Sequence, residues 1–271
     1  VASYDTAKFL NDYSRRFKSR FKIHIEVDTG MRRIGLDHKS AFETIKQISA
    51  LKNLELEGIF THFATSEEKN KTFSKLQLKR FNKLLGDLKR AGIEFPIVHS
   101  ANSGGVLDLK GSYFNMVRPG LLLYGYYPGS GVRNKIKLKP VMNLKSKVTF
   151  IKKIGTRESV SYGRKYFAKQ PEFIASVPIG YGDGYWRLLS NKAKVGINKK
   201  LYRQIGSVTM DWIMVALGRK YSIRIGDDVL LMGEENGFNL GADKLAKLCG
   251  TIPYEMLCAV ADRVERVYLN G

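Results

Sequence analysis

Residues 23–30 read IHIEVDTG, a short apolar run that ends in a polar cluster. Runs of this kind predict strands over residues 23–28, 56–63, 97–100 and 115–118, each followed by polar residues. The segments between them carry apolar residues at helical spacing, namely Ala41, Ile45, Ile48 and Leu51, and Leu76, Phe81, Leu84, Leu85 and Leu88. Strands that alternate with helices predict a parallel sheet of βα units. In a (β/α)8 barrel the active site is built at the C-terminal strand ends, so the polar clusters mark a candidate site.

Only four strand-and-helix units are visible, whereas a complete barrel needs eight units and about 250 residues. Four strands alone leave two open sheet edges, so we expect that another segment completes the sheet or that the sequence lacks an N-terminal part. After the Gly-, Pro- and Lys-rich stretch 127–139, short strands are predicted over residues 141–151, 173–178, 204–215 and 228–232, with a helix over 242–249. The predicted class is therefore α/β: the C-terminal half of a (β/α)8 barrel over residues 1–135, followed by a mainly β domain over residues 136–271.

The composition of the 271 residues excludes several protein classes. Hydrophobic residues make up 44% and charged residues 26%, which argues against a disordered or fibrous chain. No apolar run approaches the length of about 18 residues that spans a bilayer, and the start lacks the pattern of a signal peptide. Two cysteines are too few for a disulfide framework, and they have no metal-ligand spacing around them, so we expect no metal site and a cytoplasmic protein.

The formal net charge of +21 raises the question of a polyanionic partner. The lysines are scattered along the expected helices and strand rims, and no zinc-finger spacing or aromatic nucleic-acid signature accompanies them. This distribution favours a solvated basic surface and makes a nucleic-acid function unlikely on sequence grounds, although a functional polyanion contact stays open.

Eight short motifs carry more residue-specific information than the pattern does. They are HIEVDTGMRRIG (24–35), GIFTHFA (58–64), HSANSGG (99–105), MVRPGLLLYG (116–125), VSYGRKY (160–166), PIGYGDGY (178–185), SVTMD (207–211) and PYEMLC (253–258). In this order, and through almost the whole chain, they resemble the alanine racemase family. The resemblance implies a fold-type III enzyme that interconverts L- and D-alanine with pyridoxal 5′-phosphate, for D-alanine and peptidoglycan precursor supply. It also implies a head-to-tail homodimer with a shared active site.

The same resemblance assigns roles to individual residues. It makes Tyr162 the catalytic tyrosine, which exchanges a proton with one face of the substrate α-carbon in the other subunit. It places Arg118 at the pyridine nitrogen of the cofactor, where an arginine that keeps its proton leaves the ring nitrogen largely unprotonated. The remaining cofactor contacts that it implies are Arg33, His62, His99, Ser103, Gly120, Leu121 and Tyr254, and the substrate contacts are Arg33, Tyr181 and Met210.

Ordinary structural roles remain open for several of these residues. Arg118 could be a surface arginine before a Pro-Gly turn, and Ser103 with Gly120 could be a helix cap and a turn. His62 and His99 could be satisfied core histidines, and Tyr181 could be a packed strand residue.

Three positions depart from the family pattern. The lysine motif that forms the Schiff base with the cofactor is absent, and no lysine of this chain can be assigned that role, so we expect the chain alone to be inactive. Glu26 stands where many members carry a carbamylated lysine, and we expect its carboxylate to support Arg33 directly or through a water; the alternative is that it points to Arg32 or Lys22. Ser207 stands where arginine is common, with no obvious compensation.

The leading hypothesis is thus the C-terminal portion of an alanine racemase, whose missing segment supplies the lysine for a two-base mechanism. A racemase for serine, lysine or another amino acid is the second enzymatic reading, because pocket contacts decide the substrate. The non-enzymatic alternatives are a remnant that holds cofactor weakly and a basic polyanion-binding protein.

Overall fold

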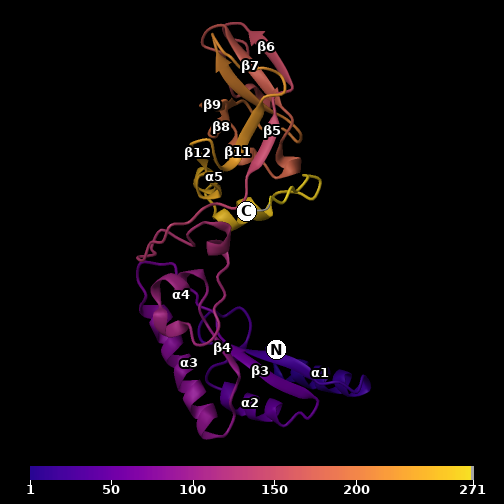
Figure 1. The fold of residues 1–271 in the computed structure, drawn as a ribbon, viewed down its shortest axis with the longest axis vertical. Helices are drawn as coiled ribbons and strands as arrows, with labels where there is room; N and C mark the ends of the chain where they lie inside the picture. The colour runs from indigo at the N-terminus through magenta and orange to yellow at the C-terminus, as the bar shows by residue number, and fades with distance from the viewer. Residues whose placement is uncertain (270–271) are drawn as a thin grey trace. The chain divides into compact units, whose positions relative to one another are not determined.

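The computed structural model describes residues 1–269. The chain divides into two compact units, drawn in Figure 1 from indigo at the N-terminus to yellow at the C-terminus. The N-terminal unit comprises residues 1–123 and 127–137, and the C-terminal unit comprises residues 124–126 and those from 138 onward. The domain boundary expected between residues 135 and 136 stays a prediction.

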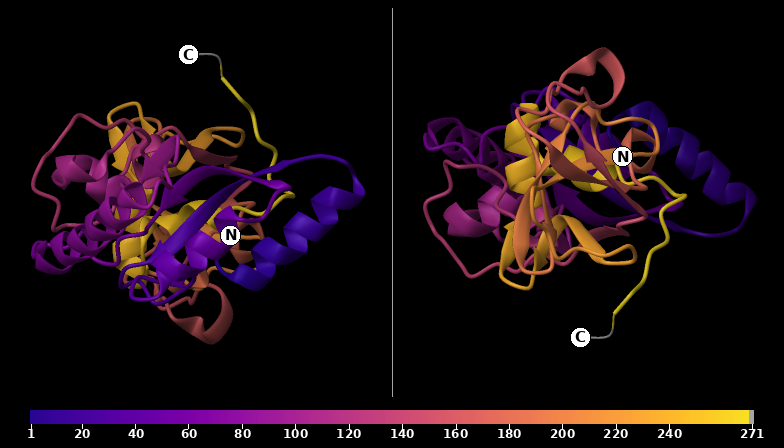
Figure 2. Two further views of the ribbon diagram at one scale, coloured as in Figure 1. Left: turned by 90° about the horizontal axis from the view of Figure 1, so that it is seen from below. Right: turned by 90° about the horizontal axis from the view of Figure 1, so that it is seen from above.

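A parallel four-stranded sheet in the order β2-β1-β3-β4 forms the centre of the N-terminal unit. Its strands are β1 (Phe21–Asp28), β2 (Leu36–Asp37), β3 (Leu54–Phe60) and β4 (Ile97–His99). The helices are α1 (Tyr4–Arg16), α2 (Ala41–Ser49), α3 (Thr72–Arg90) and α4 (Ser103–Asp108), with short 3-10 turns η1 (Lys110–Ser112) and η2 (Leu121–Tyr124). Sequence periodicity found β1, β3, β4, α2 and α3 but missed β2 and α1; α1 is the blue helix near the N-terminus in both views of Figure 2.

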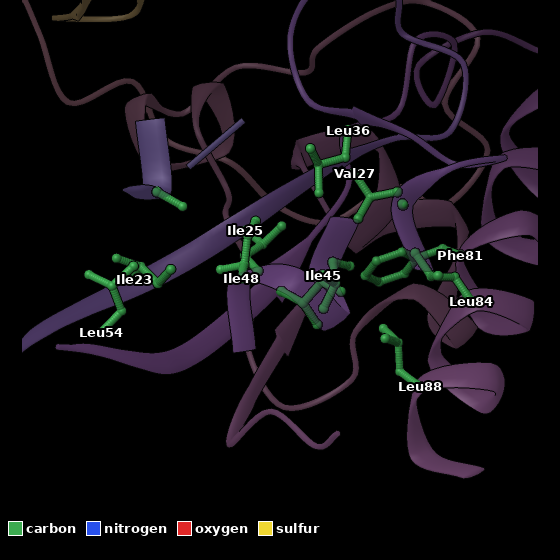
Figure 3. Close-up of a cluster of buried hydrophobic side chains, with 13 residues drawn as sticks. Ile23, Ile25, Val27, Leu36, Ile45, Ile48, Leu54, Phe81, Leu84 and Leu88 are labelled. Carbon is green, nitrogen blue, oxygen red and sulfur yellow. The ribbon is translucent and has the colours of Figure 1, made fainter. Parts of the chain in front are cut away.

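The core of this unit lies between the sheet and its helices. Ile23, Ile25 and Val27 of β1 pack with Ile45 and Ile48 of α2, and with the buried face of α3 (Figure 3). Side chains alternate across a strand, so His24 and Glu26 lie on the opposite face of β1. Burying one side chain at these positions stabilises the fold by about 1.5–3 kcal/mol, which fixes the polar face of β1 away from the helices.

The strand expected over residues 115–118 is wrong, because this segment makes only a single parallel bridge to β4, between His99 and Met116. The side chain of Asn115 takes the place of a regular ladder: its amide oxygen accepts from the Val98 N–H at 2.8 Å, and its amide nitrogen donates to the Pro96 carbonyl at 2.6 Å. Pro119 then follows and cannot donate a backbone hydrogen bond.

The C-terminal unit is built on an antiparallel eight-stranded sheet. Seven strands follow the order β12-β11-β8-β9-β10-β7-β6, and β5 pairs with β11. The bounds are β5 (Leu144–Lys147), β6 (Phe150–Ile154), β7 (Glu172–Val177), β8 (Lys194–Ile197), β9 (Lys200–Ile205), β10 (Ile213–Gly218), β11 (Asp228–Glu235) and β12 (Phe238–Leu240). Helices α5 (Ala242–Cys249) and α6 (Pro253–Cys258) and the 3-10 turns η3 (Tyr162–Arg164), η4 (Tyr181–Asp183) and η5 (Arg187–Leu189) complete the unit. An α/β unit followed by a mainly β unit confirms the predicted fold class.

Two strands predicted for this unit are each interrupted. Residues 141–151 give β5 and the start of β6, and residues 204–215 give the end of β9 and the start of β10. The second interruption begins at Gly206, which has φ of 72° and would bring a Cβ within 2.7 Å of the Val160 carbonyl oxygen. Only glycine takes this conformation without strain, so the chain leaves the sheet and forms a loop that carries Ser207 and Met210.

Among residues 1–269, no helix is long and apolar enough to cross a membrane. Within the same residues no cluster of three or more His, Cys, Asp or Glu side chains could hold a metal ion. Cys249 and Cys258 are both free thiols.

Candidate active site

The guanidinium of Arg118 lies at the C-terminal ends of β3 and β4. Its Nη2 donates to the Thr61 carbonyl at 2.9 Å and lies 3.4 Å from Nδ1 of His62, while its Nη1 donates to Nδ1 of His99. The ring of Phe60 is 5.0 Å from the guanidinium carbon, in a cation–π contact. Burial lowers the pKa of Arg118, and the charge of Glu26 opposes this shift. The group stays a cation whose N–H bonds are fixed in direction.

Both histidines beside Arg118 are neutral at neutral pH. Burial, reinforced by the positive charge of Arg118, lowers the pKa of His62 to about 4 and that of His99 to about 3. His99 is 3% exposed and stacks on the ring of Phe60, with the ring centroids 4.7 Å apart. The structure therefore brings the predicted residues His62, His99 and Arg118 together as one polar group.

Ser103 is the first residue of α4 and is 3% exposed. Its hydroxyl oxygen accepts from the Gly120 N–H at 2.9 Å and lies 3.5 Å from the Leu122 nitrogen, so the hydroxyl hydrogen remains free to donate to another group. Asn102 caps the helix by accepting from the Gly105 N–H at 3.0 Å. The resemblance assigns Ser103, Gly120 and Leu121 to the cofactor. These three residues lie side by side within the N-terminal unit.

Arg33 and Glu26 influence each other without a direct ion pair. Burial raises the pKa of Glu26, while the charges of Arg33 and Arg118 act against this shift. No ion pair of 4.0 Å or less joins Glu26 to Arg33 in the part of the chain that the structure describes, so the direct form of the expected contact does not form. The alternative partners are engaged elsewhere, because Arg32 pairs with Asp37 at 2.6 Å and Lys22 pairs with Glu57 at 2.9 Å.

Tyr162 begins η3 in the C-terminal unit, and its side chain is 74% exposed. One hydrogen bond holds its backbone, because Ser207 Oγ donates to the Tyr162 carbonyl at 2.8 Å. The neighbouring Ser161 Oγ in turn donates to the Ser207 carbonyl at 2.7 Å. Ser207, for which the sequence offered no compensation, thus ties the segment of Tyr162 to the loop that carries Met210.

Tyr181 and Met210 are held next to each other in the same unit. The Tyr181 N–H donates to the Thr209 carbonyl at 3.0 Å, and the Gly182 N–H donates to the Met210 carbonyl at 2.9 Å. Arg263 bridges the two segments by pairing with Asp183 at 2.8 Å and with Asp211 at 2.7 Å. Tyr254 lies on α6 in this unit and is 40% exposed.

Sequence reasoning missed Gln77, which is fully buried on the apolar face of α3. Its amide nitrogen donates to the His62 carbonyl at 2.9 Å, and its amide oxygen accepts from the Ala64 N–H at 3.0 Å. An amide four residues before the apolar Phe81, on the same helical face, was the signal that could have identified it. Gln77 therefore fixes the backbone that carries His62.

Comparison with known proteins gives consistent matches over both units. The family model described as "Alanine racemase, N-terminal domain" matches residues 1–128, and "Alanine racemase, C-terminal domain" matches residues 141–268. The alanine racemase of Clostridium novyi (strain NT) is 46% identical over all of this chain, which spans 71% of that protein. The alanine racemase structure of Clostridium difficile 630 has a TM-score of 0.94 at 38% identity, covering 99% of this chain and 70% of that one. The alanine racemase structure from Bartonella henselae, with covalently bound pyridoxal phosphate, has a TM-score of 0.85 at 31% identity, covering 99% and 72% respectively.

Proposed function

Because the chain belongs to the alanine racemase family, as its motifs predict, we propose that it interconverts L- and D-alanine with pyridoxal 5′-phosphate held by the N-terminal unit. The observation that carries the proposal is the arrangement at Arg118. A half-buried guanidinium, fixed by the Thr61 carbonyl and by His99, is a donor that suits an unprotonated ring nitrogen.

The donor set of the N-terminal unit fits this cofactor at both ends. The free hydroxyl hydrogen of Ser103 suits a phosphate group, with the backbone at Gly120 and Leu121 beside it. His62 and Arg33 would lie by the ring with Arg118, and His99 would hold Arg118 through its Nδ1. When bound, the cofactor supplies an electron sink for the charge left by the α-proton, and an arginine at its ring nitrogen weakens that sink and disfavours transamination.

Tyr162 moves the proton on one face of the substrate α-carbon. Its exposed side chain on a pinned backbone fits a residue that completes the site of a second subunit, and we propose a homodimer with shared active sites. Arg33, Tyr181 and the Met210 N–H bind the substrate carboxylate. Arg263 keeps Tyr181 and Met210 in register through Asp183 and Asp211.

The second base is a lysine, and no lysine of this chain is assigned to that role. We propose that it belongs to a segment outside these 271 residues; the chain spans 71% of the Clostridium novyi protein, which leaves room for such a segment in a relative. The complete enzyme is this chain joined to the N-terminal segment of a relative.

A coupled D-alanine assay tests the proposal. With added cofactor, the 271 residues alone should not turn over alanine, whereas the complete enzyme should. Turnover by the chain alone would overturn the assignment of the second base. A folded complete enzyme that binds cofactor and yet fails to racemise alanine would overturn the proposed function.

A further inference from the structure

Glu57 is the extra residue of a β-bulge between β1 and β3. Ile23 faces Leu56 and His24 faces Gly58, so Glu57 has no partner of its own in the register. A bulge re-aims the side chain of the extra residue, and the Glu57 carboxylate lies 3.2 Å from Nε2 of His24. Gly58 makes this possible, because a Cβ there would lie 2.8 Å from Cγ of His24 and overlap the rest of the ring.

His24 continues from Glu57 to the group already described around Arg118. Its Nδ1 lies 2.8 Å from Nε2 of His99, whose Nδ1 accepts from Arg118. Glu57, His24, His99 and Arg118 thus form one row of hydrogen bonds that runs from the middle of β3 to the proposed cofactor contact.

The two ends of this row of hydrogen bonds, Glu57 and Arg118, allow only one arrangement of protons on the two histidines. Arginine can only donate, so Nδ1 of His99 accepts and the proton of that neutral ring sits on Nε2. His99 Nε2–H then donates to Nδ1 of His24, which places the proton of a neutral His24 on Nε2, pointing at Glu57. An ionised carboxylate can only accept, so both ends demand the same tautomers. The hydrogen bond from Lys22 lowers the pKa of Glu57 and keeps it ionised.

We propose that Glu57 is a positioning residue that fixes the Nε2–H tautomers of His24 and His99 and thereby holds Arg118 in place. The consequence for catalysis rests on the proposed function, since Arg118 matters there as the donor to the cofactor ring. Without Glu57, His24 is free to carry its proton on Nδ1, which allows His99 to carry its proton on Nδ1 as well. That tautomer of His99 cannot accept from Arg118.

Nitrogen NMR tests the tautomers without any cofactor. The sequence has only four histidines, so selective ¹⁵N-histidine labelling of the full chain gives few signals. The variants His38→Gln and His62→Gln identify the signals of those two residues, and the signals that remain belong to His24 and His99. In the unaltered chain at neutral pH, His24 and His99 should each show a protonated Nε2 and an unprotonated Nδ1. A protonated Nδ1 on His99 would overturn the proposal.

Variants at neighbouring carboxylates isolate the effect of Glu57. Glu57→Leu should lose the single pattern and give mixed tautomers at His24 and His99. Glu57→Gln should lose it as well, because a donor nitrogen replaces one of the two oxygens that face Lys22 and His24. Glu55→Leu is the matched control, because Glu55 lies on the same strand 3.8 Å from Lys22, and no contact joins it to His24 within the described residues. An unchanged pattern in a folded Glu57→Leu chain would refute the proposal. Should that variant fail to fold, Gly58→Ala, which displaces the His24 ring while Glu57 stays, must give the same loss.

Kinetics of the complete enzyme then separate this inference from the proposed function. Glu57→Leu should lower kcat about 10-fold or more, the value of one hydrogen bond to a charged group, with little change in the KM for alanine, whereas Glu55→Leu should leave both unchanged. An unchanged kcat together with altered tautomers would refute the role toward Arg118. If the unaltered complete enzyme is inactive, the proposed function fails, while the NMR result still decides the role of Glu57 in the histidine chain.

Discussion

Replacing Lys71 by methionine should destabilise the N-terminal unit far more than the same replacement at a surface lysine. Nζ of Lys71 lies 2.8 Å from Oδ2 of Asp108, and the two side chains are only 7% and 2% exposed. Lys71 also donates to the Ser66 carbonyl at 2.6 Å, and Ser66 Oγ donates to the N-cap Asn102 at 2.6 Å. The pair therefore supports both ends of α4, the helix that begins with Ser103.

The magnitude follows from burial. Removing one partner of a buried ion pair costs about 3–5 kcal/mol, because the remaining charge stays buried. Asp108 keeps hydrogen bonds from the Arg133 N–H at 2.9 Å and the Asn134 N–H at 2.9 Å, so we expect the lower end, about 3 kcal/mol. Lys83→Met is the control: Lys83 lies 2.7 Å from Asp87 with side chains 78% and 26% exposed, and it should cost less than about 1 kcal/mol.

The assay must report on the N-terminal unit alone. Both tryptophans, Trp186 and Trp212, lie in the C-terminal unit, so tryptophan fluorescence would follow the other unit. Native-state hydrogen exchange of the slowest amides in β1 and β3 measures the free energy of opening of the N-terminal unit itself. Equal losses in Lys71→Met and Lys83→Met would refute the reasoning from burial.

The difference in stability between the parent chain and Lys71→Met, measured as the free energy of opening of the N-terminal unit, should also depend on pH. Burial by itself would raise the pKa of Asp108, but the hydrogen bonds from Asn134, Lys71 and Arg133 outweigh it and hold that pKa below its usual value. A lowered carboxyl pKa stabilises the fold above the unfolded value of about 3.9, and this contribution is lost as the pH falls through the folded value. The difference should be complete at neutral pH and shrink in acid; a constant difference would contradict the assignment to Asp108.

Three further predictions concern the site and the surface. In the complete enzyme, Tyr162→Phe should reduce racemisation about 10²- to 10⁴-fold with nearly intact cofactor binding, measured by D-alanine formation and cofactor absorbance; unchanged turnover would remove Tyr162 from the mechanism. The complete enzyme should be indifferent to bicarbonate, because Glu26 supplies a carboxylate near Arg33 without a carbamate, while Glu26→Gln should lose activity; a fully active Glu26→Gln or a bicarbonate requirement would contradict this role. Binding of the chain to DNA or RNA should be weak and should collapse between about 50 and 200 mM salt, and a sequence-specific complex at physiological salt would show that the charge of +21 is more than a solvated surface.

The sequence by itself determined the elements whose burial is periodic. The alternation of Ile23, Ile25 and Val27 predicted β1, and helical spacing predicted α2 and α3, because a residue's neighbours along the chain reveal which face is apolar. The motifs predicted the family, and the strand pattern placed His62 and His99 at strand ends, whereas the strand expected before Arg118 does not form. Parallel strands bring such ends to one edge, so their grouping followed from the fold class.

Only the tertiary structure decided the contacts between distant residues. His24 and His99 are 75 positions apart, and the bulge that turns Glu57 toward His24 has no signal in the pattern of β3. The side chain of Asn115 replaced an expected strand, and Gly206 ended another, through bonds and space that depend on other segments. Periodicity reports how deeply a side chain is buried, whereas its hydrogen-bond partner depends on where a remote part of the backbone lies, and that position is set by the packing of the whole unit.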